Sequence, residues 1–235
     1  MPIDTSRISG SDDNVANHTL SKPNNDGKSG SFDRSQAESL LKQYVESPAL
    51  HRHCYMVAVA LEAYAQHLLT DQNQNKNRNK TENKLGEEIV SNSIDPETWY
   101  IAGLLHDLDW EKYPDQHPLE ATQEILPVAG CPDEIIQAIK SHAPQRTGVE
   151  PTTLLDRYLF ACDELSGFLD AVAKVRPDGF KDLKYSSVKK KLKNKSFAAN
   201  VSREDIALGA QLINQELADH TEFLVKTFAD QKIPS

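Results

Sequence analysis

Apolar residues recur at intervals of three and four along much of the chain after Ser35, and this spacing constrains the fold more than any other feature. Residues 37–45 and 48–70 each carry an apolar stripe of this kind, which is typical of one face of an amphipathic helix. Helix-start signals precede later stripes, as in Asp95-Pro-Glu-Thr. No run of alternating polarity is long enough to indicate a strand. The sequence therefore predicts an all-α fold, a bundle of helices.

Two stretches interrupt the helical pattern. Residues 1–32 are rich in Ser, Asn, Asp and Gly, and they have too few apolar residues to offset the entropy of ordering. The run at about 71–93 is also low in complexity, and structureless loops of that length are uncommon inside a compact domain. We therefore expect a disordered tail, followed by a single helical domain over residues 33–230 with a solvated insertion at about 71–93.

Start and stop signals set the expected helix boundaries within this domain. Pro48 closes the first helix and can open the second, which we expect to end near residue 70. Thr152 or Thr153 is expected to cap a long helix through about Val175, and Ser202 is expected to begin the last helix with a capping box.

Composition limits the classes of function. The net charge of −9 over 235 residues argues against broad nucleic-acid binding, which depends on Lys and Arg to neutralise phosphates. No segment approaches the roughly 18–20 apolar residues of a membrane helix, and the first residues lack a signal-peptide pattern. A cytoplasmic protein with no membrane partner is expected. Cys54, Cys131 and Cys162 are too scattered for a disulfide framework and are expected to be reduced and packed. The oligomeric state is not indicated.

The stretch from Gly103 to Pro118 is dense in residue types that bind metals. His106 and Asp107 follow an apolar run, and further acids and His117 come soon after them. Adjacent residues on a helix diverge by about 100°. His106 and Asp107 can therefore reach one ion only from the end of a helix, approaching it from two sides.

Three more candidate ligands lie elsewhere in the chain. His53 falls on an apolar helical stripe, His142 near a helix end, and Asp163 beside the apolar face of a later helix. A lone histidine on such a face is more often a core residue, but the whole set favours a metal site. An ionised carboxylate beside an apolar stripe is costly unless a cation pairs with it. Imidazole and carboxylate ligands without thiolate indicate one or two divalent ions of Fe, Mn, Co, Ni, Zn or Mg, without choosing among them.

These residues resemble the signature of the HD-domain superfamily of metal-dependent phosphohydrolases, in which a helical histidine is followed by His-Asp and then by a distant aspartate. The matching residues are His53, His106-Asp107 within Gly-Leu-Leu-His-Asp-Leu, and Asp163. The resemblance covers about residues 35–215. It implies an HD-domain-like helical bundle that acts on a small phosphorylated substrate, a phosphomonoester or phosphodiester, with nucleotides included.

Binuclear members of that superfamily add two histidines, one in a His-Pro segment and one at a later helix end. HD-GYP phosphodiesterases and diiron oxygenases resembling myo-inositol oxygenase are of this kind, and His117 and His142 match their additional positions. The resemblance implies two ions that share a bridging, catalytic Asp107, the first bound by His53, His106 and Asp163 and the second by His117 and His142.

The chain departs from these relatives after the His-Asp pair. Many relatives continue His-Asp-Ile-Gly-Lys, with the lysine near the substrate phosphate, whereas Asp109 and Trp110 stand here. No Gly-Tyr-Pro motif follows His142, which argues against a cyclic-dinucleotide phosphodiesterase. Asp109 is a candidate catalytic general base, although a role in capping a turn is preferred. The candidate cations for binding substrate are Lys140, Arg146, Arg176 and Lys189–Lys191.

Three hypotheses for function follow. The leading one is a metal-dependent phosphohydrolase acting on a small phosphate ester. The second is a diiron oxygenase that uses the same six ligands, and it is suggested by the presence of both His117 and His142. The third is a non-catalytic binding or regulatory module, suggested by the missing lysine after the His-Asp pair.

Overall fold

The computed structural model describes residues 32–78, 94–231 and 233, and within these ranges the chain is helical with no strand. The predicted all-α class is therefore confirmed. No helix in the described ranges combines the length and the hydropathy that crossing a bilayer requires. Almost all of the expected tail, and residues 79–93 of the expected insertion, lie outside these ranges. The elements in chain order are α1 (Arg34–Tyr44), α2 (Pro48–Arg78), α3 (Pro96–Leu105), the π-helix η1 (Ala121–Ile125), α4 (Leu126–Val128), α5 (Asp133–Ser141), α6 (Pro144–Thr147), α7 (Leu154–Lys174), α8 (Tyr185–Leu192), α9 (Arg203–Leu212) and α10 (Leu217–Asp230).

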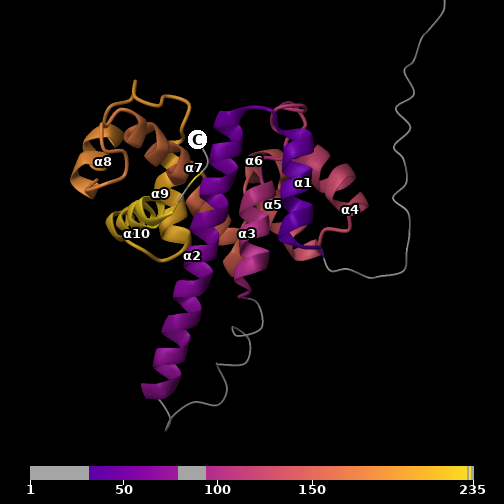
Figure 1. Cartoon of the computed structure of the whole chain (residues 1–235), viewed down its shortest axis with the longest axis horizontal. Coiled ribbons are helices and arrows are strands. Elements are labelled where there is room, and N and C mark those ends of the chain that lie inside the picture. The colour runs from indigo at the N-terminus through magenta and orange to yellow at the C-terminus, as the bar shows by residue number, and fades with distance from the viewer. Residues whose placement is uncertain (1–31, 79–93, 232, 234–235) are drawn as a thin grey trace, which may run out of the picture. The chain divides into compact units, whose positions relative to one another are not determined.

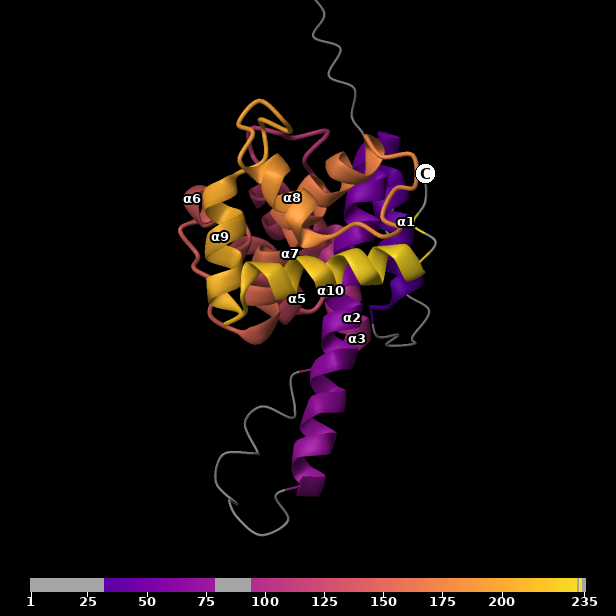
Figure 2. The ribbon, with the colours of Figure 1, turned by 90° about the vertical axis from the view of Figure 1, so that its left-hand side faces the viewer.

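The long helix α2 divides the molecule. Figure 1 shows α8, α9 and α10 on one side of it, and α1 and α3–α6 on the other. Figure 2, from the side, shows α10 crossing α2, with which it is in contact. Because α7 contacts α9 on one side and α5 on the other, it joins the two sides.

Side-chain caps begin several of the helices. The Asp33 carboxylate accepts the backbone N–H of Gln36 at the start of α1. Asp95 caps α3 in the same way, with Pro96 at the first helical position. Thr153, one of the two predicted caps of α7, accepts the backbone N–H of Asp156 and completes a capping box. These contacts satisfy N–H groups that a helix start leaves without intrahelical partners.

Helix boundaries differ from the sequence prediction in three places. Helix α2 continues to Arg78 rather than ending near residue 70, because the polar run after residue 70 contains no Gly or Pro to stop it. The helix that begins after Ser202 is α9 and not the last one, since the chain turns at Asn214, with φ of 54°, before α10. The lysine-rich segment contains the short helix α8, whose buried Val188 packs inward.

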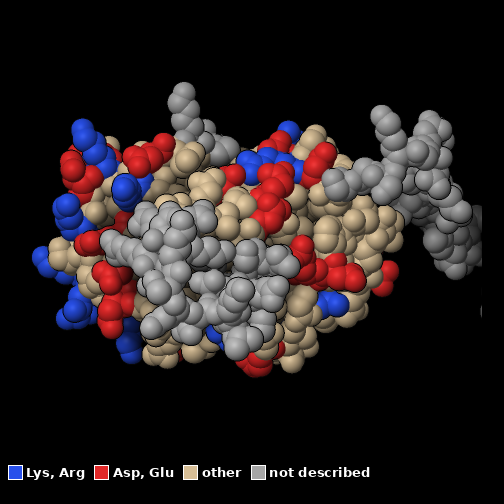
Figure 3. Space-filling view, turned by 90° about the horizontal axis from the view of Figure 1, so that it is seen from below, with Lys and Arg blue, Asp and Glu red and all other residues tan. Residues whose placement is uncertain are grey.

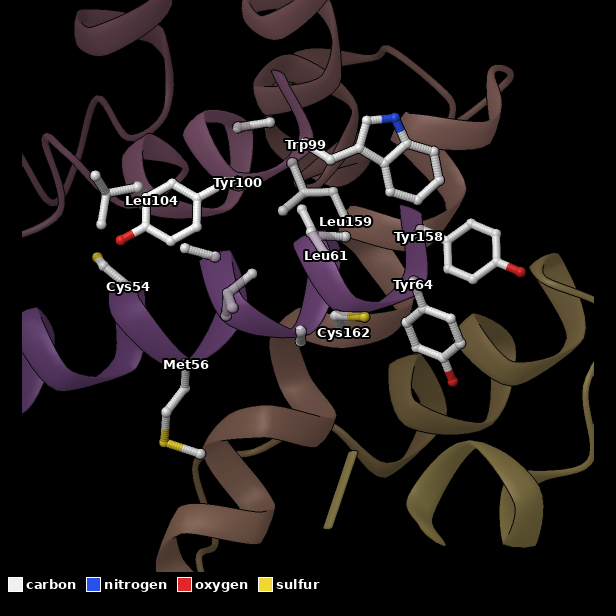
Figure 4. Close-up of a cluster of buried hydrophobic side chains, with 14 of the residues drawn as sticks. Cys54, Met56, Leu61, Tyr64, Trp99, Tyr100, Leu104, Tyr158, Leu159 and Cys162 are labelled. Carbon is white, nitrogen blue, oxygen red and sulfur yellow. The ribbon is translucent and has the colours of Figure 1, made fainter. Parts of the chain in front are cut away.

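The core lies where α2 packs against α3 and α7. Figure 4 shows Leu61 of α2 beside Leu159 of α7, with Trp99 of α3 close to them. Tyr64 of α2 packs against Tyr158 of α7. All three cysteines are buried and free, as expected for packed thiols.

A glycine sets the spacing of two of these helices. A Cβ on Gly103 of α3 would lie only 2.7 Å from the Cα and N atoms of Ala58 in α2. The two backbones can therefore come this close only because residue 103 has no side chain. This approach brings the first turns of α2 beside the C-terminal end of α3.

Candidate metal centre

The first group of candidate ligands joins three helices. His53 projects from α2, His106 is the C-cap residue of α3, and Asp163 lies on α7. The Nε2 atoms of His53 and His106 are 3.1 Å apart, and Asp163 Oδ1 lies 2.9 Å from the first and 3.3 Å from the second. These three side chains can hold a metal ion.

A second group lies beside the first. It consists of Asp107, His117 and His142, and these residues can also hold an ion. His142 is the C-cap residue of α5, and His117 lies in the turns between α3 and η1. The Nε2 atoms of these two histidines are 3.2 Å apart.

Asp107 belongs to the second group and also lies next to the first, with one oxygen toward each pair of histidines. Its Oδ2 is 3.6 Å from His53 Nε2 and 3.5 Å from His106 Nε2. Its Oδ1 is 3.4 Å from His117 Nε2 and 3.9 Å from His142 Nε2. Because α3 ends at Leu105, the adjacent His106 and Asp107 can approach the centre from different directions.

Hydrogen bonds behind the histidines fix which ring nitrogen faces the centre. His106 Nδ1–H donates to the Gly103 carbonyl at 2.8 Å, and His142 Nδ1–H donates to the Ile139 carbonyl. His117 Nδ1–H donates to Asp109 Oδ1 at 2.7 Å. In the neutral rings, each Nε2 then presents a lone pair inward, as metal-binding histidines do when the other nitrogen donates to a carbonyl or carboxylate.

A cation between the facing lone pairs would relieve their repulsion. In the pair His117–His142, both Nε2 atoms are acceptors when the rings are neutral, yet they lie 3.2 Å apart. Two acceptors at this distance repel each other unless a proton or a metal ion lies near both. The donor chemistry therefore fits divalent ions, and it matches Zn or a first-row transition metal better than Ca, which prefers oxygen ligands.

The electrostatics of the cluster also favour positive charge. Burial lowers the pKa of His106, but Asp107 and Asp163 outweigh it and raise this pKa to about 9. Burial raises the pKa of the Asp163 carboxyl, yet neighbouring His106 and His53 hold it well below its usual range. Burial lowers the pKa of His142 to about 4, with His106 adding to the effect. The protein therefore keeps carboxylates ionised around a position suited to a cation.

Asp109 lies behind His117 rather than in the cavity. Its side chain is fully buried. One oxygen accepts His117 Nδ1–H, and the other accepts the Ala121 backbone N–H at 2.8 Å. With both oxygens engaged, Asp109 is placed to orient His117, and this position differs from both the general-base role and the turn cap considered from the sequence.

A cavity of about 370 Å³ opens onto the two groups. Of the predicted substrate-binding cations, Arg146 alone is among the described residues that line it, and Lys140 and Arg176 are not. Arg146 donates to the carbonyls of Pro114 and His117 and lies over the Trp110 ring. The described residues around the cavity are His53, Asp107, Trp110, His117, His142, Ala143, Gln145, Arg146, Phe160, Asp163, Glu164, Gly167, Asn200, Val201 and Asp205.

The other predicted substrate-binding cations lie away from the cavity. Arg176 closes the turn after α7 by donating to the carbonyls of Gly179 and Lys181. Lys189–Lys191 lie on α8 and are not among the described residues around the cavity. Figure 3 shows Lys and Arg side chains gathered at its left edge, the side on which Figure 1 places α8.

Sequence reasoning missed the part of the cavity that comes from Glu164 and from the α8–α9 connection. Glu164 follows Asp163 directly on α7, and this acidic neighbour was the one available signal. Burial raises the pKa of Glu164 to about 7, and nearby Asp163 adds to the effect. Asn200 and Asp205 carry no motif, and they reach the cavity only because α9 packs on α7.

Comparison with known proteins agrees with this geometry. The family model described as HD domain matches residues 50–167, which is half of the chain and contains all six candidate ligands. No match was found among curated proteins or among solved structures. With the His…His-Asp…Asp residues gathered at one centre in an all-α fold, the chain belongs to the HD-domain family.

Proposed function

We propose that this protein is a metal-dependent hydrolase of small phosphate esters with a two-ion centre. The observation that carries the proposal is the position of Asp107, whose two oxygens face two separate pairs of histidines. A carboxylate placed in this way can bridge two ions. Divalent ions bound there would supply Lewis acidity and a water-derived nucleophile at neutral pH.

The chain's own residues would prepare the site in three ways. The carbonyls of Gly103 and Ile139 hold the His106 and His142 rings with Nε2 inward. Asp109 would do the same for His117 and thus act as a positioning residue. Arg146 lines the cavity and can bind a phosphoryl oxygen while its contacts with backbone carbonyls keep it in place.

The size of the cavity supports a small substrate. Its volume of about 370 Å³ falls near the lower end of the range of roughly 300–1,000 Å³ that is typical of small-molecule sites. A phosphomonoester or a mononucleotide fits this range. The family itself contributes the expectation of phosphate-ester chemistry.

A panel of phosphate esters assayed with Mn, Mg, Fe, Co, Ni and Zn tests the proposal. We expect turnover with at least one ion, and its loss in both His106→Ala and Asp107→Ala. The Arg176→Lys variant, which changes a cation outside the cavity, should keep the activity. If the fully metal-loaded protein hydrolyses no ester, the proposal fails.

A diiron oxygenase is the second candidate, and the observation that favours it is the complete second group of ligands, with Asp107, His117 and His142. In this case protein purified anaerobically from its own host would contain iron, and substrate would stimulate oxygen uptake. His117→Ala should then lower the metal content from two ions to one. If the metal content stays at one ion in both proteins, the oxygenase is rejected, and so is the two-ion centre of the hydrolase.

A binding or regulatory module is the remaining alternative. It would bind a phosphorylated ligand without turnover, and it would keep this binding in a His106→Ala, Asp107→Ala double variant. Activity that the same double variant abolishes would exclude it.

A further inference from the structure

The connection between α8 and α9 forms part of the cavity wall. Asn200 and Val201 from this connection line the cavity, together with Asp205 in the first turn of α9. These residues follow the region that matches the HD-domain family, which ends at residue 167. The wall is therefore a feature of this chain rather than of the matched family core.

A single guanidinium holds this connection in shape. Arg203 Nη1 donates to the carbonyls of Ala198 and Val201, each at 2.6 Å. Its Nη2 donates to the Phe197 carbonyl and, at 3.5 Å, to the Asn194 carbonyl. Four carbonyls of residues 194–201 thus converge on one side chain. The carbonyls of Asn194 and Ala198 also accept the backbone N–H groups of Phe197 and Val201.

The same guanidinium rests on the helix that carries Asp163. Its Cζ lies 4.9 Å from the centre of the Phe168 ring on α7. Phe197 from the connection packs edge-on against that ring, with centroids 5.7 Å apart. A Cβ on Gly209 of α9 would lie 2.7 Å from Ala161 Cα of α7, so α9 can pack this closely on α7 only because residue 209 has no side chain.

The wall contributes hydrogen-bonding side chains to the cavity and no Lys or Arg side chain from the described residues. Asn200 contributes an amide, and Asp205 and Glu164 contribute carboxylates. Glu164 is joined to the wall because it accepts the Ser202 backbone N–H at 3.1 Å. Among the described residues around the cavity, Arg146 is the one Lys or Arg side chain, so a second phosphate on the substrate would find no additional partner there.

We infer that residues 194–202, together with the adjacent Asp205 and Glu164, form a preshaped wall which selects esters whose organic part donates hydrogen bonds, and that Arg203 is the positioning residue of segment 194–202. The inference rests on the proposed function for the existence of turnover, while the shape of the wall is independent of it. Hydroxyl or amino groups of the substrate would meet Asn200, Asp205 and Glu164. The phosphoryl group would lie toward the metal centre and Arg146.

The test compares Arg203→Lys with Arg157→Lys, the same substitution at an exposed position of α7. A lysine keeps the charge but cannot reach four carbonyls from one planar group. The substrates are glucose 6-phosphate, whose organic part is rich in hydroxyls, and phenyl phosphate, whose organic part has none. Inorganic phosphate serves as an inhibitor that reports on the metal centre alone.

We expect the wild-type protein to have a higher kcat/KM for glucose 6-phosphate than for phenyl phosphate, although phenol is the better leaving group. Arg203→Lys should raise KM for glucose 6-phosphate at least tenfold. Its kcat/KM for phenyl phosphate, its inhibition by phosphate and its metal content should stay within about twofold of wild type. Arg157→Lys should change none of these values.

Several results would overturn the inference. A higher kcat/KM of the wild type for phenyl phosphate would contradict the proposed selection. An equal loss of kcat/KM for both substrates in Arg203→Lys would show that Arg203 only stabilises the fold. If the metal-loaded wild type hydrolyses neither ester nor any other in the panel, the proposed function fails, and selection by the wall fails with it. Hydrogen exchange then decides on the wall's shape alone, because residues 194–202 should exchange faster in Arg203→Lys while α7 is unchanged.

Discussion

Replacing Gly103 by alanine tests whether the spacing of α2 and α3 holds the metal centre together. The new Cβ would lie 2.7 Å from Ala58 Cα and N and 2.8 Å from the Val57 carbonyl carbon. All three are backbone atoms of α2, so no side chain can rotate away to make room. The helices themselves must separate.

These distances give the separation of the α2 and α3 backbones that the variant requires. Contacts become ordinary at 3.4 Å, so the backbones must part by about 0.7 Å. Overpacking of this kind lowers the free energy of unfolding by about 1–3 kcal/mol. The better helix propensity of alanine offsets only about 0.5–1 kcal/mol of this loss. The movement also reaches the site, because Gly103 accepts the His106 ring N–H and because His53 lies little more than one turn before Ala58. A misplacement approaching 1 Å can lower turnover by about 100-fold.

Gly167→Ala is the matched control. A Cβ there would lie 3.8 Å from two atoms of the His53 ring, which is ordinary contact, so this variant should be neutral or more stable by up to about 1 kcal/mol. Urea unfolding and the metal content of the purified proteins measure both effects. The reasoning is refuted if Gly103→Ala is as stable and as metal-loaded as wild type, or if Gly167→Ala loses as much as Gly103→Ala does.

Three further predictions concern other parts of the structure. Asp109→Asn places an amide N–H against either His117 Nδ1–H or the Ala121 N–H. We expect one of the two ions to bind about 10–100-fold more weakly, as measured by competition with a chelator. Unchanged affinity for both ions would contradict the positioning role of Asp109. Burial lowers the pKa of His220 to about 4, below the value of about 6.5 in the unfolded chain, so protons bind the unfolded state preferentially and stability falls as pH drops from about 6.5 towards 4. Between pH 7 and pH 5 this effect lowers the free energy of unfolding by about 2 kcal/mol. In urea unfolding, the decrease between these two pH values should therefore be about 2 kcal/mol smaller for His220→Gln than for wild type. The variant also disturbs the hydrogen bond with Tyr64, but this loss is the same at both pH values. Removing bound metal with a chelator should lower the free energy of unfolding by about 2.7 kcal/mol for each bound ion, relative to protein kept at an ion concentration 100 times its Kd. A melting temperature independent of added metal would argue against binding to the folded chain.

The helices and the ligand-bearing positions could be predicted because their signals are local. Helix periodicity predicts α3 and α7, and the N-caps Asp95 and Thr153 mark where these helices begin. His106 and Asp107 then fall where an apolar run stops, and that position alone indicates that they can point to a shared centre. The position of Asp163 beside an apolar stripe likewise indicated a buried carboxylate in need of a cation.

The cavity wall could not be predicted because it depends on contacts between distant segments. Asp205 lies in the cavity only because Gly209 lets α9 contact the backbone of α7. The direction of a long cationic side chain is equally beyond local sequence, so Arg146 could not be separated in advance from Lys140 and Arg176. The role of Asp109 depends on an N–H twelve residues later in the chain.

The two groups of ligands also bear on how the chain keeps its folded form. His53 and Asp163 are 110 residues apart in sequence, and an ion bound between them would act as a reversible cross-link. Closing a loop of that length would lower the entropy of the unfolded chain, as a disulfide of the same span would, by an amount worth about 4–5 kcal/mol. The three buried cysteines form no such bond. The supply of metal in the cell would thus control the lifetime of the protein as well as its chemistry.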